Sequence, residues 1–345
     1  MSDPAKANEM DRGNRIFEPT VTLIGFGEAA QAFVAGWHVS RPSITTHGFD
    51  IKTQSDSATA TAKRAEFHQA GTANHRSLAD AVKAGEPGPI ISLVTASQAL
   101  SAAVETSMAD LGGRLFLDGN SCSPQTKRKA ADRINGAMGR YVDVAVMSPV
   151  HPRLHRTPTL VSGPHAEAAR QVMTDLDMDV AVVDGPVGAA AAIKLCRSIM
   201  VKGIESLVAE MLAAARTLGV ERIVLESLDA SHGHAGTRWE SLSANALQRM
   251  MEHGERRAEE MEAAVDMLAD MGLPHRMSEA TARWQRQVAK FRQGDREADA
   301  RIPTEFLVEA LSPPRDRAAE SPLEESGRPP RQKRSIRSNS SVSAK

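Results

Sequence analysis

The stretch TVTLIGFGEAA, residues 20–30, decides the fold. Its first part, TVTLI, is an apolar, β-rich run typical of a buried strand, and the helical pattern AAQAFVAGW follows the glycines. In such a unit Gly25 makes the tight turn, Gly27 lets the backbone approach a pyrophosphate, and Ala30 permits close helix packing. We therefore predict a dinucleotide-binding loop, with a purely structural glycine-rich turn as the alternative. Its predicted cofactor-binding residues are Gly25, Phe26, Gly27, Glu28, Ala29 and Ala30.

Asp50 follows the next predicted strand, residues 44–49. An acidic side chain at this point accepts hydrogen bonds from the adenosine ribose hydroxyls and repels a 2′-phosphate. This favours NAD over NADP, although Lys52 lies close enough to weaken the preference. The alternative is that Asp50 only caps the following helix.

Strand and helix patterns keep alternating as far as residue 184. The further strand-like runs are residues 90–94, 114–117, 141–147, 159–162 and 180–183. Such alternation predicts a Rossmann-type doubly wound α/β domain over residues 19–184, whose ligands lie beyond the carboxyl ends of its parallel strands. Thr95, which we assign to the cofactor, and Ser121 both fall at such ends. For each of them, capping of the next helix is the alternative.

From residue 185 onward the sequence predicts helices almost exclusively, over residues 193–218, 221–228, 237–251 and 254–271. We assign this all-α domain, residues 185–311, to the substrate and to dimerisation. Its first helix is long and Ala-rich, and such helices often contact a partner subunit, so we expect a homodimer. It carries Lys194 among Ala189–Ala192, Ile193 and Leu195. A lysine in apolar surroundings is seldom ordinary surface charge, although it can also extend from the polar edge of an amphipathic helix.

Composition argues against several classes of partner. The 345 residues carry a formal net charge of -1 and only 3% aromatic residues, so nothing favours nucleic acid or an anionic membrane. Residues 1–18 have no apolar signal-peptide core and read as a flexible arm, residues 312–345 read as a disordered tail, and we expect a cytoplasmic protein. Two cysteines are too few for a disulfide framework. His232 and His234 have no cysteine or acidic cluster nearby, so we expect no metal.

Four motifs occur in the order found in the β-hydroxyacid dehydrogenase superfamily, which includes 6-phosphogluconate, 3-hydroxyisobutyrate and tartronate semialdehyde enzymes. They are GFGEAA (25–30), DGNSCSP (118–124), DVAVMSPV (143–150) and GPVGAAAAIK (185–194). The chain resembles this superfamily from about Val21 to Arg292. The resemblance implies an NAD(P)-dependent dehydrogenase that moves a hydride between nicotinamide and a small 3-hydroxy acid or 3-hydroxy-2-amino acid. It also implies that Ser121 contacts the substrate and that Lys194 is the general acid/base.

Two departures from the family pattern fall in the predicted substrate site. Met147-Ser148-Pro149 replaces Ser-Gly-Gly, and Pro149 has no N–H to offer a carboxylate, which leaves Ser148 as the expected substrate contact. The asparagine expected one turn after the lysine is absent. Arg197 and Ser198 stand there instead, and Lys202, two turns on, projects from roughly the same face. Ser198 and Lys202 are assigned to the substrate.

The pattern HGERRAEEM (253–261), with these departures, resembles a branch labelled only as 6-phosphogluconate dehydrogenase-like with a C-terminal domain of unassigned function. We expect this charged run to be mostly a solvated helix face, with an arginine aimed at a substrate carboxylate as the alternative. Two other functions stay open: an imine reductase on the same fold, and a non-catalytic dinucleotide-binding sensor. The identity of the substrate does not carry over.

Overall fold

The computed structural model describes residues 19–232 and 238–291. The predicted arm, residues 1–18, and the predicted tail, residues 312–345, lie outside these described residues, as does His234. The described strands form one eight-stranded sheet in the order β3-β2-β1-β4-β5-β6-β7-β8. The strands are β1 Thr20–Ile24, β2 Thr45–Phe49, β3 Ala73–Asn74, β4 Ile90–Ser92, β5 Leu115–Asp118, β6 Arg140–Val146, β7 Thr159–Ser162 and β8 Val180–Val182.

The strand order reverses beside β1. This strand lies between β2 and β4, and both pair with it in parallel. The chain leaves β1 towards β2 and β3 and then returns to the other side of β1 with β4, β5 and β6. In doubly wound folds ligands bind at such a reversal, beyond the carboxyl ends of the strands. The predicted α/β fold class is confirmed for this part of the chain.

One strand pair departs from the prediction of a parallel sheet. β7 runs antiparallel to β6, with Val144 opposite Val161. The connection between these strands, residues 147–158, contains a 3-10 turn, η4 (Leu154–Arg156), and no helix that could carry the chain across a face of the sheet. A parallel strand needs such a crossover, so the chain turns back beside β6 instead.

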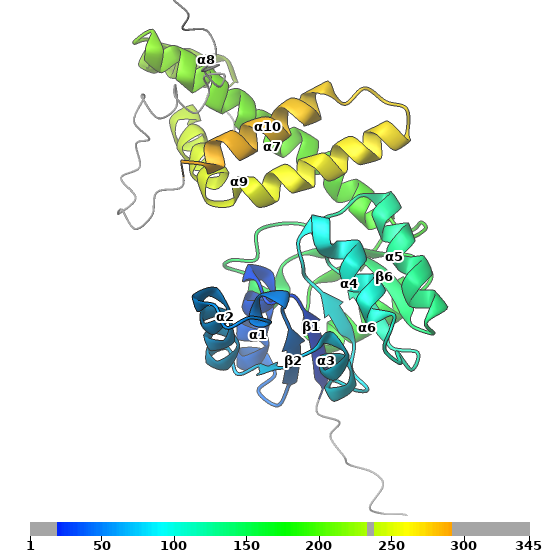
Figure 1. The fold of residues 1–345 in the computed structure, drawn as a ribbon. Coiled ribbons are helices and arrows are strands. Elements are labelled where there is room, and N and C mark those ends of the chain that lie inside the picture. Colours follow the sequence, from blue (N-terminus) through cyan, green and yellow to red (C-terminus); the bar gives the residue numbers. More distant parts are fainter. Residues whose placement is uncertain (1–18, 233–237, 292–345) are drawn as a thin grey trace, which may run out of the picture. The chain divides into compact units, whose positions relative to one another are not determined.

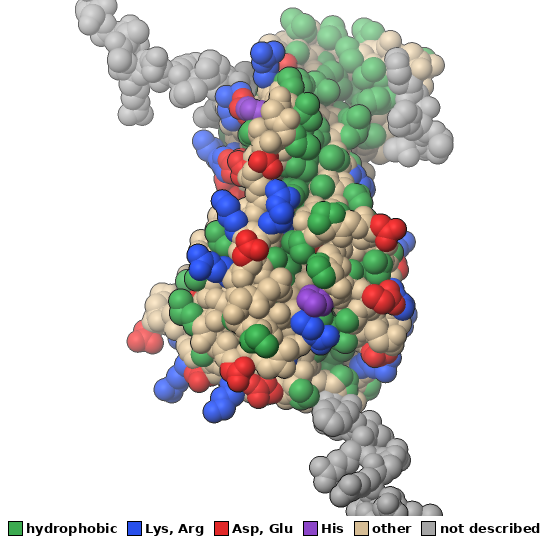
Figure 2. Space-filling view, turned by 90° about the vertical axis from the view of Figure 1, so that its right-hand side faces the viewer, with side chains coloured by type: hydrophobic (Ala, Val, Ile, Leu, Met, Phe, Trp, Pro, Cys, Tyr) green, Lys and Arg blue, Asp and Glu red, His purple; other side chains and the backbone are tan. Residues whose placement is uncertain are grey.

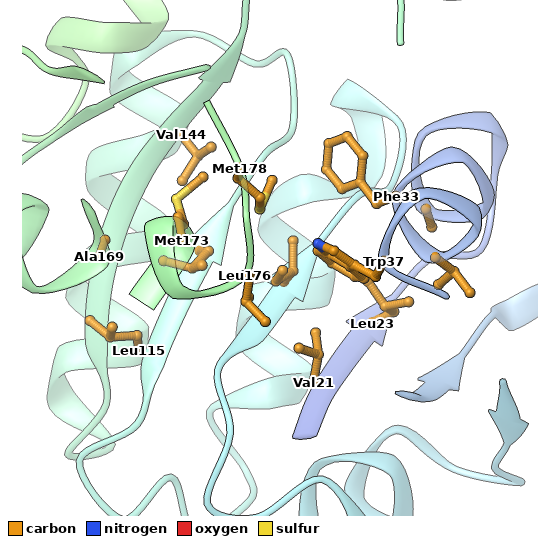
Figure 3. Packing of buried hydrophobic residues seen from close by; sticks show 14 of the residues in the cluster. Val21, Leu23, Phe33, Trp37, Leu115, Val144, Ala169, Met173, Leu176 and Met178 are labelled. Carbon is orange, nitrogen blue, oxygen red and sulfur yellow. The ribbon is translucent and has the colours of Figure 1, made fainter. Parts of the chain in front are cut away.

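Helices cover both faces of the sheet (Figure 1). They are α1 Glu28–Ser40, α2 Ala58–Gln69, α3 Leu78–Ala84, α4 Ala99–Thr106, α5 Pro124–Gly136 and α6 Ala166–Asp175, with short 3-10 turns η2 Ile51–Thr53 and η3 Ala96–Gln98. Neighbouring residues of β5 point to opposite faces. Leu115 (Figure 3) and Leu117 join the core formed with α1 and α6, whereas Phe116 joins the core formed with α3 and α5. Burial on both faces explains why these strands read as continuous apolar runs.

The remaining described elements are helices: α7 Ala189–Thr217, α8 Glu221–His232, α9 Trp239–Asp270 and α10 Arg276–Ala289. This confirms the all-α prediction, with two corrections: α10 was not among the predicted helices, and the predicted division of α9 was wrong. α9 is a single helix of 32 residues, where the sequence predicted two stretches divided near Gly254. Gly254 is buried, and a Cβ there would collide with the backbone of Gln285 on α10, so this glycine permits close helix packing instead of ending a helix. Among the described residues, no helix is both long and apolar enough to cross a bilayer.

Candidate active site

Lys194 lies in the second turn of α7 and reaches the loop that follows β5. Its Nζ donates a hydrogen bond to Oγ of Ser121 over 2.6 Å. Burial lowers the pKa of Lys194, the attraction of Glu260 opposes this shift, and the positive charges of Arg256 and Lys127 add to it. A lower pKa increases the fraction of neutral amine, which is the form that accepts a proton. The structure thus brings together the predicted general acid/base and the predicted substrate contact at the carboxyl edge of the sheet.

Two polar side chains of the sheet fix the start of α7. Gly188 precedes the helix with a φ of 102°, in the left-handed region that favours glycine. Oδ2 of Asp143 on β6 accepts hydrogen bonds from the N–H of Gly188 at 3.0 Å and of Ala191 at 3.1 Å. Ser162 on β7 accepts a further N–H of the same turn at 3.1 Å. The first N–H groups of a helix have no partner within it, so these caps set where α7 begins and thereby where Lys194 lies.

Ser198 and Lys202 follow Lys194 at one-turn intervals on α7, and both are buried. They meet Glu260 of α9: the Ser198 hydroxyl donates to Oε1, and Nζ of Lys202 lies 2.9 Å from the same oxygen. Burial lowers the pKa of Lys202 to about 8, against the attraction of Glu260. Burial alone would raise the pKa of Glu260, but Lys194, Lys202 and the hydrogen bond from Ser198 outweigh it and lower this pKa to about 2. Lys202 is therefore held in an internal ion pair, whereas Lys194 bonds to a hydroxyl.

Glu205 extends this polar face of α7. Arg257 of α9 contacts one of its carboxylate oxygens, and Nη2 of Arg249 lies 2.8 Å from the other. Gln285 of α10 donates to Glu205 at 3.3 Å. Three elements that lie far apart in the sequence are thus joined by charged and polar contacts on the inner face of α7.

The run at residues 253–261 corrects the prediction of a mostly solvated face. Glu255 and Arg256 are exposed, but Arg257 and Glu260 point into the interface between α9 and α7. Glu260 was missing from the predicted site. Its signal was the spacing of three buried residues of α9, Gly254, Ala258 and Met261, which marks the inner face of the helix and places Glu260 beside it.

The glycine-rich loop has the geometry that its motif predicts. Gly25 has a φ of 83°, and a Cβ on it would lie 2.7 Å from the carbonyl oxygen of Leu93, so only glycine fits the turn. Gly27 is exposed, and no neighbouring atom lies within 4 Å of the position that its Cβ would take. α1 begins after Gly27 without a side-chain cap. The N-terminus of α1 therefore borders open space beside Gly27, which suits a pyrophosphate.

Asp50 ties this loop to the end of β2. Its carboxylate accepts the N–H of Phe26 at 2.8 Å and the N–H of Lys52 at 2.9 Å. The capping role that the sequence offered as an alternative is therefore present at η2. The ribose contact stays a prediction, since a carboxylate has further lone pairs to share. The ring of Phe26 is buried and stacks on Phe67 with centroids 3.9 Å apart, which leaves only its backbone for a cofactor.

Thr95 and Ser148 have hydrogen-bond partners other than Lys194 and Ser121. Thr95 is exposed at the start of η3, where its hydroxyl lies 3.0 Å from that of Ser97. Ser148 donates to the carbonyl of Pro149, next to it in the chain, at 3.4 Å. Neither is hydrogen-bonded to Lys194 or Ser121 in the part of the chain that the structure describes. Within that same part, no group of three or more His, Cys, Asp or Glu side chains is arranged to hold a metal ion.

Comparison with known proteins identifies a family segment within the helical region. Residues 215–288 match the family model described as "Domain of unknown function (DUF1932)". A conserved hypothetical protein from Sinorhizobium meliloti 1021 is similar at 28% identity and a TM-score of 0.62, over 86% of this chain and 98% of that one. Conserved protein MTH1747, of unknown function but reported as structurally similar to 3-hydroxyacid dehydrogenases, matches at 28% identity and a TM-score of 0.58, over 78% of this chain and 96% of that one.

Two enzymes share the fold at lower identity. The 3-hydroxyisobutyrate dehydrogenase of Mycobacterium tuberculosis, solved with L-serine, is 18% identical with a TM-score of 0.62, over 85% of this chain and 99% of that one. A variant imine reductase from Myxococcus stipitatus, in complex with NAD+, is 18% identical with a TM-score of 0.50, over 85% of this chain and 99% of that one. At these identities the likeness shows the fold alone. The predicted resemblance is confirmed at that level: the chain has the fold of 3-hydroxyacid dehydrogenases and carries a DUF1932 segment.

Proposed function

We propose that this chain, which has the fold of 3-hydroxyacid dehydrogenases, is an NAD(P)-dependent oxidoreductase that acts on a small 3-hydroxy acid or 3-hydroxy-2-amino acid. The observation that carries the proposal is the 2.6 Å hydrogen bond between Nζ of Lys194 and Oγ of Ser121. It joins an amine of lowered pKa to a hydroxyl at the carboxyl edge of a sheet whose first loop suits a pyrophosphate.

The chemistry needs a proton acceptor beside the carbinol hydroxyl. A bound NAD(P) would supply the hydride acceptor at nicotinamide C4, and the hydroxyl would lose its proton as the hydride leaves. The neutral amine of Lys194 takes this proton and returns it in the reverse direction. The Ser121 hydroxyl both donates and accepts, so it can hold the amine in either protonation state. Asp50 favours NAD, because a carboxylate beside the ribose repels a 2′-phosphate.

The decisive comparison is between the wild type and Lys194→Ala. Cofactor reduction is followed by absorbance with NAD and NADP against a panel of 3-hydroxy acids and 3-hydroxy-2-amino acids. We expect Lys194→Ala to lose about 10²- to 10⁴-fold in kcat, the usual contribution of a positioned acid/base. NAD binding, measured by titration calorimetry, should stay close to the wild-type value and tighter than that of NADP.

Lys83→Ala is the matched control, because Lys83 is an exposed lysine in the last turn of α3, outside the site. Wild-type turnover by Lys194→Ala would contradict the assigned role. Turnover of cyclic imines but no hydroxy acid would replace the dehydrogenase by an imine reductase. Cofactor binding without turnover of either class would favour a sensor.

We also propose that α7 contacts a second copy of the chain. Four of its large apolar side chains, Ile193, Met200, Ile204 and Leu207, are exposed by 41%, 66%, 40% and 56%. Their spacing puts them on one helix face, away from the buried face that carries Lys202 and Glu205. Figure 2 shows hydrophobic side chains gathered along one side of the helical region. A contiguous exposed apolar face of this kind is typical of a protein interface.

A further inference from the structure

Three charged side chains are completely buried beneath the loop that carries Ser121. They are Asp118 at the end of β5, Lys127 on α5 and Asp143 on β6, each with a relative exposure of 0%. Nζ of Lys127 lies 3.0 Å from Oδ1 of Asp118 and 3.3 Å from Oδ1 of Asp143. It also donates to the carbonyl oxygens of Asp118 at 2.5 Å and Val144 at 3.4 Å. The ammonium thus bridges two carboxylates from neighbouring strands.

Asp118 contacts the loop that carries Ser121, and Asp143 contacts the start of the helix that carries Lys194. Oδ1 of Asp118 accepts the N–H of Asn120, directly before Ser121, at 3.0 Å, and its Oδ2 accepts the hydroxyl of Tyr141 at 2.6 Å. Oδ2 of Asp143 accepts the N–H groups that open α7, the helix that carries Lys194. A continuous set of contacts therefore runs from the Ser121 loop through Lys127 to the first turn of α7.

The charges in this cluster specify where α7 must lie. Two carboxylates face one ammonium, which leaves a net negative charge in a site without solvent. Burial alone would lower the pKa of Lys127. The negative charges of Asp118 and Asp143 outweigh this effect and raise the pKa, so Lys127 stays an ammonium ion. The N-terminus of a helix carries about half a positive charge, and here it is aimed at Asp143. The partial positive charge of the first turn of α7 thus balances the surplus negative charge when its N–H groups donate to Asp143.

We propose that Asp143 and Lys127 are positioning residues that hold Lys194 within hydrogen-bonding distance of Ser121. The inference rests on the proposed function, in which Lys194 is the reacting amine. Neither residue is joined to the glycine-rich loop by a described contact, so their loss should disturb the amine and leave cofactor binding intact. A misplacement of about 1 Å at a reacting group is enough for a loss of about 10²-fold in rate.

The test measures the amine itself, without any substrate. Lys194 is acylated with acetic anhydride as a function of pH, and its rate is read by peptide mass spectrometry in the wild type and in Asp143→Asn. The charged and titratable groups that act on Lys194 are Glu260, Arg256, Lys127 and Cys122. Asp143→Asn replaces none of these side chains, and Asp118 still pairs with Lys127, but the substitution removes one of the charges that raise the pKa of Lys127 and of Cys122. We expect the labelling profile of Lys194 to move to higher pH by about one unit, towards an ordinary lysine, as the amine leaves its buried position. NAD affinity should stay at the wild-type value.

Arg114→Met is the matched control. Arg114 is also buried, and it lies beside the other end of β5, where it donates to the carbonyl oxygens of Val82 and Gly85. Its loss should destabilise the fold and leave the Lys194 profile unchanged. An equal shift in Arg114→Met, or a wild-type profile in folded Asp143→Asn, would overturn the proposal.

A milder variant covers the case in which Asp143→Asn does not fold. Ser162→Ala removes one hydrogen-bond donor to Asp143 and one cap of α7. We expect a smaller shift in the same direction, and an unchanged Lys194 profile would again overturn the proposal. If the wild type turns over no substrate but these profiles shift as expected, the proposed reaction fails and the positioning inference stands. Where a substrate is found, kcat should fall far more than KM changes.

Discussion

Lys194 and Lys202 share one face of α7, yet their partners differ. Lys194 bonds to the hydroxyl of Ser121 at the edge of the sheet, whereas Lys202 is 5% exposed and paired with Glu260 over 2.9 Å. A lysine locked against a carboxylate is poorly placed to exchange protons with a ligand. Lys202 instead contacts Glu260 and donates a hydrogen bond to Ser198, and so helps to hold both side chains in place.

Glu260→Gln should destabilise the protein in a pH-dependent way. Because the pKa of Glu260 is lowered from 4.5 to about 2, its ionised form stabilises the fold fully above pH 4.5, and this stabilisation is lost as the pH falls towards about 2. Removing one partner of a buried pair should lower the free energy of unfolding by about 3 kcal/mol at pH 7. Urea unfolding between pH 7 and pH 2 measures this difference, which should shrink in acid.

Glu262→Gln is the control on the same helix, because Glu262 pairs with Arg286 on the surface and is 48% exposed. Its loss should change the free energy of unfolding by less than about 1 kcal/mol. Equal effects of the two substitutions at pH 7 would show that Glu260 is not a buried structural charge.

At the scale of the elements, glycines decide how the long helices pack. Gly254→Ala should lower the free energy of unfolding by about 1–3 kcal/mol, because its Cβ would collide with the backbone of Gln285 and force α9 away from α10. Gly203→Ala on α7 is the opposite case. Its Cβ would meet no atom closer than Thr281 Oγ1 at 4.0 Å, so the better helix former should add up to about 1 kcal/mol. Denaturant unfolding of both variants checks the difference in sign, and a stabilising Gly254→Ala would contradict this packing.

Local patterns predicted the elements well. The strand, turn and helix at residues 20–30 were recognisable because each step depends on neighbours in the chain, and Gly25 has the positive φ that its turn requires. β3, whose two residues carry no pattern, was not predicted, and neither were the helices α6 and α10. The division of α9 at Gly254 was wrong because a helical glycine can serve a distant backbone instead of ending a helix.

The buried polar face of α7 could not be predicted from local sequence. The hydroxyl of Ser198 donates a hydrogen bond to Glu260, 62 residues further along the chain. Glu205 accepts a hydrogen bond from Gln285, 80 residues further along. From the sequence, Ser198 is assigned to the substrate and Glu205 has no assigned role, because local sequence does not reveal a partner so far along the chain. Asp143 shows the same limit, because its role as a cap of α7 depends on Gly188, 45 residues away.

At the scale of the whole molecule, the exposed apolar face of α7 decides the oligomeric state that we propose. Met200→Glu combined with Leu207→Glu should shift the protein from dimer to monomer in sedimentation velocity, because two charges would have to be buried in the interface. Val39→Glu is the matched control. Val39 is 82% exposed near the C-terminal end of α1 and is not part of the apolar face of α7, so its substitution should leave the dimer intact. A monomeric wild type, or a double variant that stays dimeric, would contradict the proposed interface.

The capped start of α7 also has a mechanical consequence. The helix has 29 residues, so it is about 43 Å long, and Lys194 stands only about 9 Å from its fixed end. For a rigid rod that pivots at Gly188, a swing of about 2 Å at the far end displaces Lys194 by only about 0.4 Å. The amine of Lys194 lies close to the fixed end of the helix, where such a motion is smallest. The distal part of the helix can thus shift to admit a ligand or accommodate a partner while the amine stays close to Ser121.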